Sequence, residues 1–336
     1  MTVMAVYGWR EFWSMGEGRG APSFFLSITS FPRRGHDMHV LMPGAPDAAA
    51  EESYHGVTLH RMRTRVDFMP GRGNPRIVRH LKRLFTYIYW LMRAVPAGRA
   101  LAREIRPDVV IGMGELGAPA AYLIARSVGA PNVTRLFGIG MILEEVKASR
   151  VKLMLRYRET FALRVPASYI ILCDDGSRGD ELARDLGVDL SKLMYWPNGV
   201  DKKLYSADAG DLQEAARDVR ARLGISPEEV VLLSVSRLHA EKRVDRVISA
   251  LGDPSCPLSG VSIVIVGEGP TESGLRKLSR ERGIEDRVIF AGGVGREELP
   301  AYYRAADVFV AVSDRTNVSN SLHEAMMSGL PVVALN

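Results

Sequence analysis

The chain has 336 residues, of which 46% are hydrophobic. This is enough for two modest cores, since single cores rarely grow beyond roughly 250 to 300 residues. Its two cysteines, Cys173 and Cys256, are far apart in sequence. That excludes a disulfide framework and a cysteine-rich zinc site and favours a reducing, cytosolic setting. The net charge is +5, and the basic excess concentrates in residues 61–106, where Asp67 and Glu104 are the only acidic residues. Contact with something anionic is expected there.

The N-terminal segment MTVMAVYGWREFWSMGEG has neither a basic leader nor a cleavable apolar stretch. The longest apolar run, residues 84–92, is about half the length of a membrane-spanning helix. The sequence therefore predicts a cytoplasmic protein without a secretion signal or a membrane span.

Short apolar, β-branched segments alternate with amphipathic segments, the pattern of parallel strands joined by crossover helices. In the first half the predicted strands are TVMAVYG, MHVLMP, VTLHRM, DVVIGMG, NVTRLFG, YIILCD and LMYWPN. In the second half they are VVLLSVS, VSIVIVG, VIFAGG, VFVAV and PVVAL. A polar, charged stretch at 201–224 separates the two series and is predicted to be the domain junction. We therefore expect an N-terminal domain at 1–200 and a C-terminal domain at 225–336.

The segment between the third and fourth predicted strands is expected to be a long helix. One apolar stripe, predicted to pack against the sheet, contains Ile77, Leu81, Leu84, Ile88 and Leu91. Basic and aromatic residues occupy other faces, and those of interest are Arg76, Arg79, Lys82, Arg83 and Trp90. Two interpretations are open for this second set. It is either a solvated helix face or a surface for an anionic membrane and the acceptor, where each Lys or Arg contributes about 1 kcal/mol.

The segment VVLLSVSRLHAEKRVDRVISAL carries the most informative charges. A predicted strand ends before Arg237, and a loop leads through Lys242 into a helix. Two cations at the carboxyl end of a strand suit a polyanion in the crevice of an open α/β sheet. An isolated Arg and Lys in a loop are usually solvated surface residues. The evidence that this pair binds an anion therefore depends on the motifs that follow.

Glycines mark the ends of the next two strands. VSIVIVG runs into Gly267, Glu268 and Gly269, and the following strand ends at Gly292 and Gly293. Glycine lets backbone approach a ligand, although it also serves tight turns.

The last motif, VFVAVSDRTNVSNSLHEAMMSGLPVVALN, places a polar loop and a short helix containing Glu324 between two strands. The free amides at the start of this helix, predicted to be capped by Asn320, form a seat for phosphate.

Taken in order, these segments resemble the donor-binding domain of glycosyltransferase family 4. The resemblance implies the α/β GT-B fold, in which two Rossmann-like domains with parallel sheets face a central cleft. WPNGVD at 196–201 resembles the family's asparagine-glycine turn before the second domain, and GEGRGAPS with RRGHDMHVL resembles its glycine-rich loop, first helix and second strand. The resemblance is strong from about Asn198 onward and looser before it. The chain stops after PVVALN, where relatives continue, so the C-terminal domain is expected to be truncated.

The resemblance also implies residue roles. Arg237 and Lys242 match the pair that holds the donor diphosphate, and Glu324 matches the second glutamate of the family's paired-glutamate motif, which binds the donor ribose. Gly18 and Gly20 lie where the N-terminal loop approaches the donor phosphate and the acceptor. Val294 matches a backbone contact to the nucleotide base. The donor-binding set is completed by Gly267, Thr316, Asn317, Ser319, Asn320 and Ser321.

Two positions depart from the family pattern. Thr316 stands where the family has its first glutamate, a contact to the donor sugar, so Thr316, Asn317 and Asp314 are candidate substitutes. The first domain lacks the histidine that many relatives place near the reaction centre. Glu115 is the titratable group identified at that end of the sheet, and it either contacts the acceptor or sugar as a catalytic residue or caps the following helix.

The resulting prediction is a retaining hexosyltransferase that moves a sugar from a UDP- or GDP-linked donor to a lipid-linked or glycan acceptor. Arg237 and Lys242 would stabilise the charge on the departing diphosphate, and losing one such group costs about 2.7 to 4 kcal/mol of barrier. The resemblance also implies that no metal and no cofactor are needed. The doublet Asp174 and Asp175 could suggest a metal site, but it is interpreted as a strand end before a helix capped by Ser177. With a lipid acceptor, a peripheral position on the inner face of the membrane follows.

Other classes remain open, as does the oligomeric state. A non-catalytic sugar-nucleotide-binding relative or scaffold would explain the absent glutamate. A sugar-nucleotide epimerase of the same fold would form products without an acceptor. A nucleic-acid-binding protein would explain the basic stretch, but that stretch carries no reader motif, so no nucleic acid partner is expected.

Overall fold

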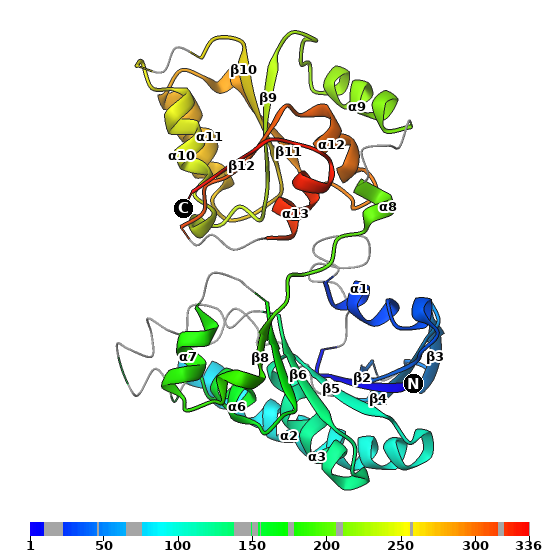
Figure 1. Cartoon of the computed structure of the whole chain (residues 1–336). Coiled ribbons are helices and arrows are strands. Elements are labelled where there is room, and N and C mark those ends of the chain that lie inside the picture. The colour runs from blue at the N-terminus through cyan, green and yellow to red at the C-terminus, as the bar shows by residue number, and fades with distance from the viewer. Residues whose placement is uncertain are drawn as a thin grey trace. The chain divides into compact units, whose positions relative to one another are not determined.

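The computed structural model divides the chain into two compact units, the first ending at Pro197 and the second beginning at Asn198 (Figure 1). The residues it describes are 1–9, 23–45, 47–64, 76–137, 149, 154, 156–173, 178–205, 211–255, 258–314 and 319–335. Each unit is built on a twisted sheet with helices on its faces, as the alternating sequence pattern predicts.

The described part of the first unit contains an 8-stranded sheet with the order β3-β4-β2-β1-β5-β6-β7-β8. Its strands are β1 (Thr2–Tyr7), β2 (Asp37–Gly44), β3 (Glu51–Tyr54), β4 (Val57–Arg63), β5 (Val109–Met113), β6 (Asn132–Leu136), β7 (Tyr169–Leu172) and β8 (Leu193–Tyr195). All seven predicted strands of this half are confirmed. The eighth, β3, is a polar edge strand that pairs antiparallel with β4, and its sequence EESY gives no apolar signal.

Helices cover both faces of this sheet. The described ones are α1 (Ser23–Thr29), η1 (Pro32–Arg34), α2 (Arg76–Ile105), α3 (Gly114–Val128), α6 (Tyr157–Arg164), α7 (Gly179–Asp185) and η2 (Leu190–Lys192). The side chains of alternate β1 residues point to opposite faces of the sheet. Met4 and Val6 join the core under α2 and α3, while Tyr7 stacks on Phe24 of α1, with ring centroids 3.7 Å apart.

The second unit holds a 5-stranded parallel sheet in the described residues, with the order β11-β10-β9-β12-β13. The strands are β9 (Val230–Val235), β10 (Val261–Val266), β11 (Val288–Gly292), β12 (Val308–Ala311) and β13 (Val332–Ala334). The helices are α8 (Lys202–Tyr205), α9 (Asp211–Arg222), η3 (Ala240–Lys242), α10 (Val244–Leu251), α11 (Glu272–Glu281), η4 (Glu285–Arg287), α12 (Leu299–Ala305) and α13 (Asn320–Met327).

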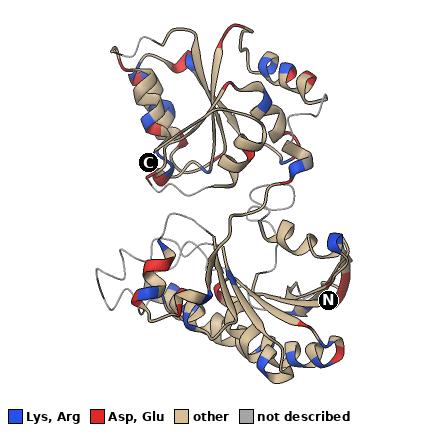
Figure 2. Cartoon of the chain, in the orientation of Figure 1, with Lys and Arg blue, Asp and Glu red and all other residues tan. Residues whose placement is uncertain are grey.

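Two cores flank this second sheet. Ile263 and Ile265 of β10 pack on α10 and α11, whereas Val264 and Val266 pack on α9 and α12. Because both faces are covered, β9 and β10 are continuous apolar runs, and the charged residues lie on the helices and loops (Figure 2).

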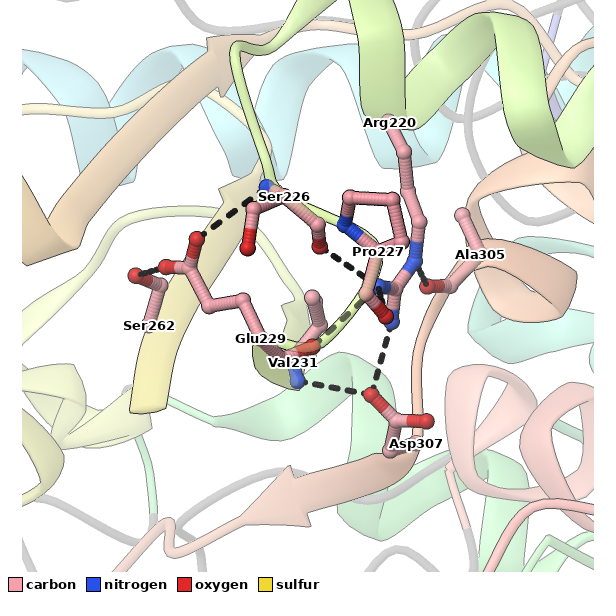
Figure 3. Close-up of polar contacts among 8 residues, drawn as sticks. All are labelled: Arg220, Ser226, Pro227, Glu229, Val231, Ser262, Ala305 and Asp307. Carbon is pink, nitrogen blue, oxygen red and sulfur yellow. Dashed lines mark hydrogen bonds and ion pairs between the residues drawn. The ribbon is translucent and has the colours of Figure 1, made fainter. Parts of the chain in front are cut away.

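Residues 201–224, expected as a junction, belong to the second unit. Arg220 of α9 donates to the carbonyls of Ala305 (2.8 Å), Ser226 (3.2 Å) and Glu229 (3.1 Å) (Figure 3). It also pairs with Asp307 at 2.8 Å, and Asp307 in turn accepts the β9 amide of Val231 at 2.8 Å. This network ties α9 to the amino ends of β9 and β12, so the stretch is part of a packed domain.

Candidate donor site

The segment that carries Arg237 is fixed by backbone hydrogen bonds at the carboxyl end of β9. The amide of Ser236 donates to Val266 O at 3.0 Å, and the amide of Leu238 donates to Glu268 O at 2.9 Å. The loops that follow β9 and β10 therefore run together. They hold Arg237 where the sequence places it, directly after the central strand of the sheet.

Gly267 and Gly269 make this close contact possible. A Cβ on Gly267 would lie 1.9 Å from Ser236 O, and one on Gly269 would lie 2.2 Å from Leu238 O. Gly267 also has a φ of 134°, which side chains rarely adopt. The predicted donor-binding role of Gly267 is not needed to explain the glycine, because loop packing alone requires it.

The cations of this region fall into two groups. Arg243 and Arg246 are committed to Asp314, with N–O distances of 3.0 and 2.6 Å, and Arg243 also pairs with Asp245 at 3.2 Å. Arg243 is the N-cap of α10 and has left-handed backbone, with a φ of 51°. Asp314, considered as a substitute for the missing glutamate, is thus used by the loop itself.

Arg237 and Lys242 form the second group. Arg237 is exposed and Lys242 is half-buried, and neither side chain has a hydrogen bond or ion pair within the described residues. Two cations without a carboxylate, beside two that are neutralised, are available to an incoming polyanion. This is the charge arrangement that the sequence predicts for this edge of the sheet.

The start of α13 lies at the same carboxyl edge, after β12. Ser319, not the predicted Asn320, is the cap, and its hydroxyl accepts the amide of Leu322 at 3.3 Å. Ser319 and Ser321 also lie in hydrogen-bonding contact, 3.1 Å apart. Serine takes the cap because its short side chain reaches the third helical amide, and this leaves Asn320 as the first helical residue.

Glu324, one turn into α13, is surrounded by two buried tyrosines. The hydroxyl of Tyr303 donates to Glu324 Oε2 at 2.9 Å and to Ser321 O at 3.1 Å, and the rings of Tyr303 and Tyr205 meet edge to face at 5.7 Å. Burial raises the pKa of Glu324 to about 7, although Tyr303, Tyr205 and the charge of Arg296 oppose the rise. Sequence reasoning missed Tyr303 and Tyr205, because nothing in their local spacing distinguishes them from core aromatics.

The loop after β11 joins the same group. Val294 packs on the core beside α12, and Arg296 pairs with Asp201 at 3.2 Å. Asp201 belongs to the WPNGVD turn, so this ion pair links the start of the second unit to the predicted base-binding loop. Arg296 was not predicted, because its role depends on a partner 95 residues away in the chain.

Glu115 lies in the first turn of α3, at the carboxyl end of the first sheet. The N-cap of this helix is Met113, which makes no side-chain cap hydrogen bond. Burial raises the pKa of Glu115 above its ordinary value, and the nearby Glu159 adds to the rise. This geometry agrees with the helix-start interpretation, and a catalytic role for Glu115 stays a prediction.

The predicted face of α2 is revised in two ways. Trp90 is 0% exposed, and its indole N–H donates to Leu116 O at 2.8 Å, so it is a core residue and not part of a surface. The stripe expected to be buried is instead largely outside. Side chains with exposed fractions between 38% and 70% are Val78, Leu81, Leu84, Phe85, Ile88 and Met92. Lys82 and Arg93 are exposed beside them, and Arg79 and Arg83 are half-buried.

Several predicted residues cannot be placed. Gly18, Gly20, Thr316 and Asn317 lie outside the described residues, and so does the side chain of Arg76. Within the described ranges, no group of three or more His, Cys, Asp or Glu side chains could hold a metal ion. No helix among those residues is long and apolar enough to cross a membrane.

Comparisons with known proteins match this architecture. The family model described as Glycosyltransferase Family 4 matches residues 28–204, and the one described as Glycosyl transferases group 1 matches residues 216–336. The crystal structure of HepE from Anabaena in complex with UDP and glucose superposes with a TM-score of 0.65 at 19% identity, covering 99% of this chain and 80% of that one.

Two curated relatives resemble part of the chain. One is an alpha-monoglucosyldiacylglycerol synthase of Streptococcus pneumoniae, 35% identical over 154 residues, 46% of this chain. The other is a GDP-mannose-dependent alpha-(1-6)-phosphatidylinositol monomannoside mannosyltransferase of Mycobacterium tuberculosis, 37% identical over 153 residues, 44% of this chain. The matches span 34% and 38% of those relatives' own lengths.

The two parallel sheets and the structural neighbours define the class of fold, which is GT-B, with two Rossmann-like domains. The chain belongs to glycosyltransferase family 4.

Proposed function

We propose that the protein is a glycosyltransferase that transfers a hexosyl group from a nucleoside-diphosphate sugar. The observation that carries the proposal is the pair of cations Arg237 and Lys242 at the carboxyl end of β9. Neither has a carboxylate partner among the described residues, and both lie beside cations that are already neutralised. Relatives and neighbours support a nucleotide-sugar donor, because one is named for GDP-mannose and another binds UDP and glucose.

The proposed chemistry follows from where charge develops. Breaking the bond between the anomeric carbon and the diphosphate leaves the electron pair, and negative charge, on the diphosphate. Arg237 and Lys242 are in place before that charge forms, so little reorganisation is needed. Glu324 accepts hydrogen bonds from the donor ribose, and Val294 contacts the base. Retention of anomeric configuration and independence of metal and cofactor are further parts of the proposal, taken from the family resemblance.

The test is donor binding by full-length variants. Arg237→Ala and Lys242→Ala should each weaken binding of UDP or GDP by about tenfold to a hundredfold, because a hydrogen bond to a charged group is worth about 1.5 to 3 kcal/mol. Isothermal titration with both nucleotides measures the effect. Arg280→Ala, an exposed arginine on α11, is the matched control and should bind as the wild type does.

Turnover assays then separate the remaining classes. If nucleotide binding is unchanged in both variants, the donor-site proposal is wrong. Donor binding without transfer or hydrolysis would identify a non-catalytic relative, and products formed without an acceptor would identify an epimerase.

For the acceptor we propose a lipid-linked glycan or glycolipid, with the protein at an anionic membrane surface on the cytoplasmic side. Two observations favour this. The two curated relatives described above are named for glycolipids, and the outer face of α2 combines exposed apolar side chains with Lys82 and Arg93. An amphipathic helix of this kind lies in the interface plane and gains from anionic lipid.

A further inference from the structure

The carboxyl edge of the first sheet carries a guanidinium group for which the donor chemistry has no use. Four neighbouring strands end at one level, and the register places Tyr7 beside Met113, Met113 beside Arg135, and Arg135 beside Ile171. Residues paired in this way point to the same face of a sheet. Because Tyr7 faces α1, Arg135 lies on that face too, among aromatic and aliphatic neighbours.

Arg135 is half-buried, and its setting is apolar. Its guanidinium carbon lies 5.4 Å from the ring centroid of Phe137, which meets Phe24 of α1 edge to face at 6.2 Å. The Nε atom is shielded from solvent and makes no hydrogen bond within the described residues. Burial lowers the pKa of Arg135, and within the described ranges the only ionisable neighbour that acts on it is the thiol of Cys173. No carboxylate in the described part of the chain neutralises this cation.

An arginine taken out of water is normally paired, because an unpaired buried charge is costly to the fold. Two other arginines of this protein have partners. Arg158 is hydrogen-bonded to Thr86 Oγ1 at 3.0 Å and to the carbonyl of Arg83, whereas Arg220 forms an ion pair with Asp307 and also donates to carbonyls. Arg135 has no such partner among the described residues. It lies at the carboxyl edge of an open α/β sheet, which is where ligands bind in such folds.

We propose that Arg135 binds a phosphate group carried by the acceptor. The planar fork of a guanidinium matches two phosphate oxygens, and the partly exposed Phe137 gives the uncharged part of the acceptor an apolar surface. The assignment of this phosphate to an acceptor rests on the proposed function. The anion-binding site itself depends only on the surroundings of Arg135.

The experiment measures phosphate binding with the cations of the second unit removed. In full-length Arg237→Ala/Lys242→Ala protein, inorganic phosphate and glycerol 3-phosphate should both raise the melting temperature, and glycerol with matched sodium chloride should not. Adding Arg135→Gln should weaken the apparent affinity for both phosphates at least about tenfold. Arg135→Lys should fold normally and keep part of the response. Glycerol 3-phosphate tests an esterified phosphate, so a response to inorganic phosphate alone would count against an acceptor site.

The ligand-free melting temperature separates a ligand residue from a structural one. If Arg135 serves a ligand, Arg135→Gln should melt at the same temperature or higher, since the substitution removes a desolvated charge that has no carboxylate partner among the described residues. Arg158→Gln, which loses a buried and hydrogen-bonded arginine, is the control and should melt at a lower temperature. A lower melting temperature for Arg135→Gln with unchanged phosphate affinity would overturn the proposal. Binding of UDP and GDP is measured separately in protein that retains Arg237 and Lys242. A wrong donor-site proposal and a wrong phosphate-site proposal therefore give different results.

Discussion

The Glu324 carboxyl shows how one residue can couple folding, pH and ligand. Its pKa of about 7 lies above the ordinary value of 4.5, so the folded protein retains this proton after the unfolded chain has lost it. Stability should therefore fall as the pH rises from about 4.5 through about 7, by up to about 3 kcal/mol, and change no further above that. Denaturant unfolding of wild type and Glu324→Gln at pH 5 and pH 8 checks this, because the variant should lack that component of the slope.

The same carboxyl predicts a pH dependence of donor affinity. An ionised Glu324 accepts from ribose hydroxyls better than a neutral one, so affinity should increase as the pH rises through about 7 in wild type but not in Glu324→Gln. Tyr303→Phe removes one donor to the carboxylate, which should move the midpoint to higher pH. An unchanged midpoint in Tyr303→Phe would show that this hydroxyl does not control the titration.

At this scale the sequence identifies charges but not their partners. Arg237 and Lys242 were predicted from their position after a strand. Among the residues that the structure describes neither has a hydrogen bond or ion pair, and their roles stay predictions. Tyr303 and Arg135 were not singled out. Whether a tyrosine reaches a carboxylate, or an arginine lacks one, depends on contacts between residues distant in the chain, which local patterns do not encode.

In α2 the hydrophobic pattern predicted the wrong buried face. Residues 84–92 are apolar nearly all around the helix, so two stripes compete for the core. The stripe that packs in the core contains Tyr87, Trp90 and Ala94. The indole N–H of Trp90 donates to a backbone carbonyl of α3. The periodicity predicts a helix with one buried face, but it does not select the face when both are apolar.

The exposed stripe of α2 carries a prediction for membrane binding. Phe85→Ser/Met92→Ser should weaken binding to vesicles that contain phosphatidylglycerol, and Lys82→Ala/Arg93→Ala should do so by about 1 kcal/mol per charge. Vesicle co-sedimentation at two salt concentrations measures both, and the charge variant should lose the salt dependence. Phe161→Ser, at a residue 51% exposed on α6, is the control. Unaltered vesicle binding combined with loss of self-association would assign the stripe to contact between copies of the chain.

Across the whole molecule, the two strand series predicted the two-domain α/β fold, and the GT-B class is confirmed. The sequence predicts a junction at 201–224, and the structure divides the chain between Pro197 and Asn198. It did not predict that residues 201–224 pack into the second unit. Their charged composition resembles a linker, and the clamp that holds α9 forms only when Arg220 meets carbonyls and Asp307 from distant segments.

This clamp predicts a loss of stability confined to one unit, because each unit has its own core. Arg220→Met leaves several carbonyls and Asp307 without their donor, which should cost the second unit about 2 to 4 kcal/mol. Hydrogen exchange followed by mass spectrometry should show faster exchange in β9 and β12 peptides and no change in β1 and β5 peptides. Arg217→Met, on the exposed side of α9, should exchange as the wild type does. Equal acceleration in both units would contradict the prediction.

The tight contact between the loops after β9 and β10 also bears on how this protein could be redesigned. Gly267 and Gly269 leave no space for a side chain, so random libraries built there would mostly sample misfolded proteins. Gly295, by contrast, has nothing within 4 Å of a built Cβ, and Val294 precedes it. A search for altered nucleotide preference is best begun in that segment after β11. New side chains can be introduced there without disturbing the loop after β9 that carries Arg237 and Lys242.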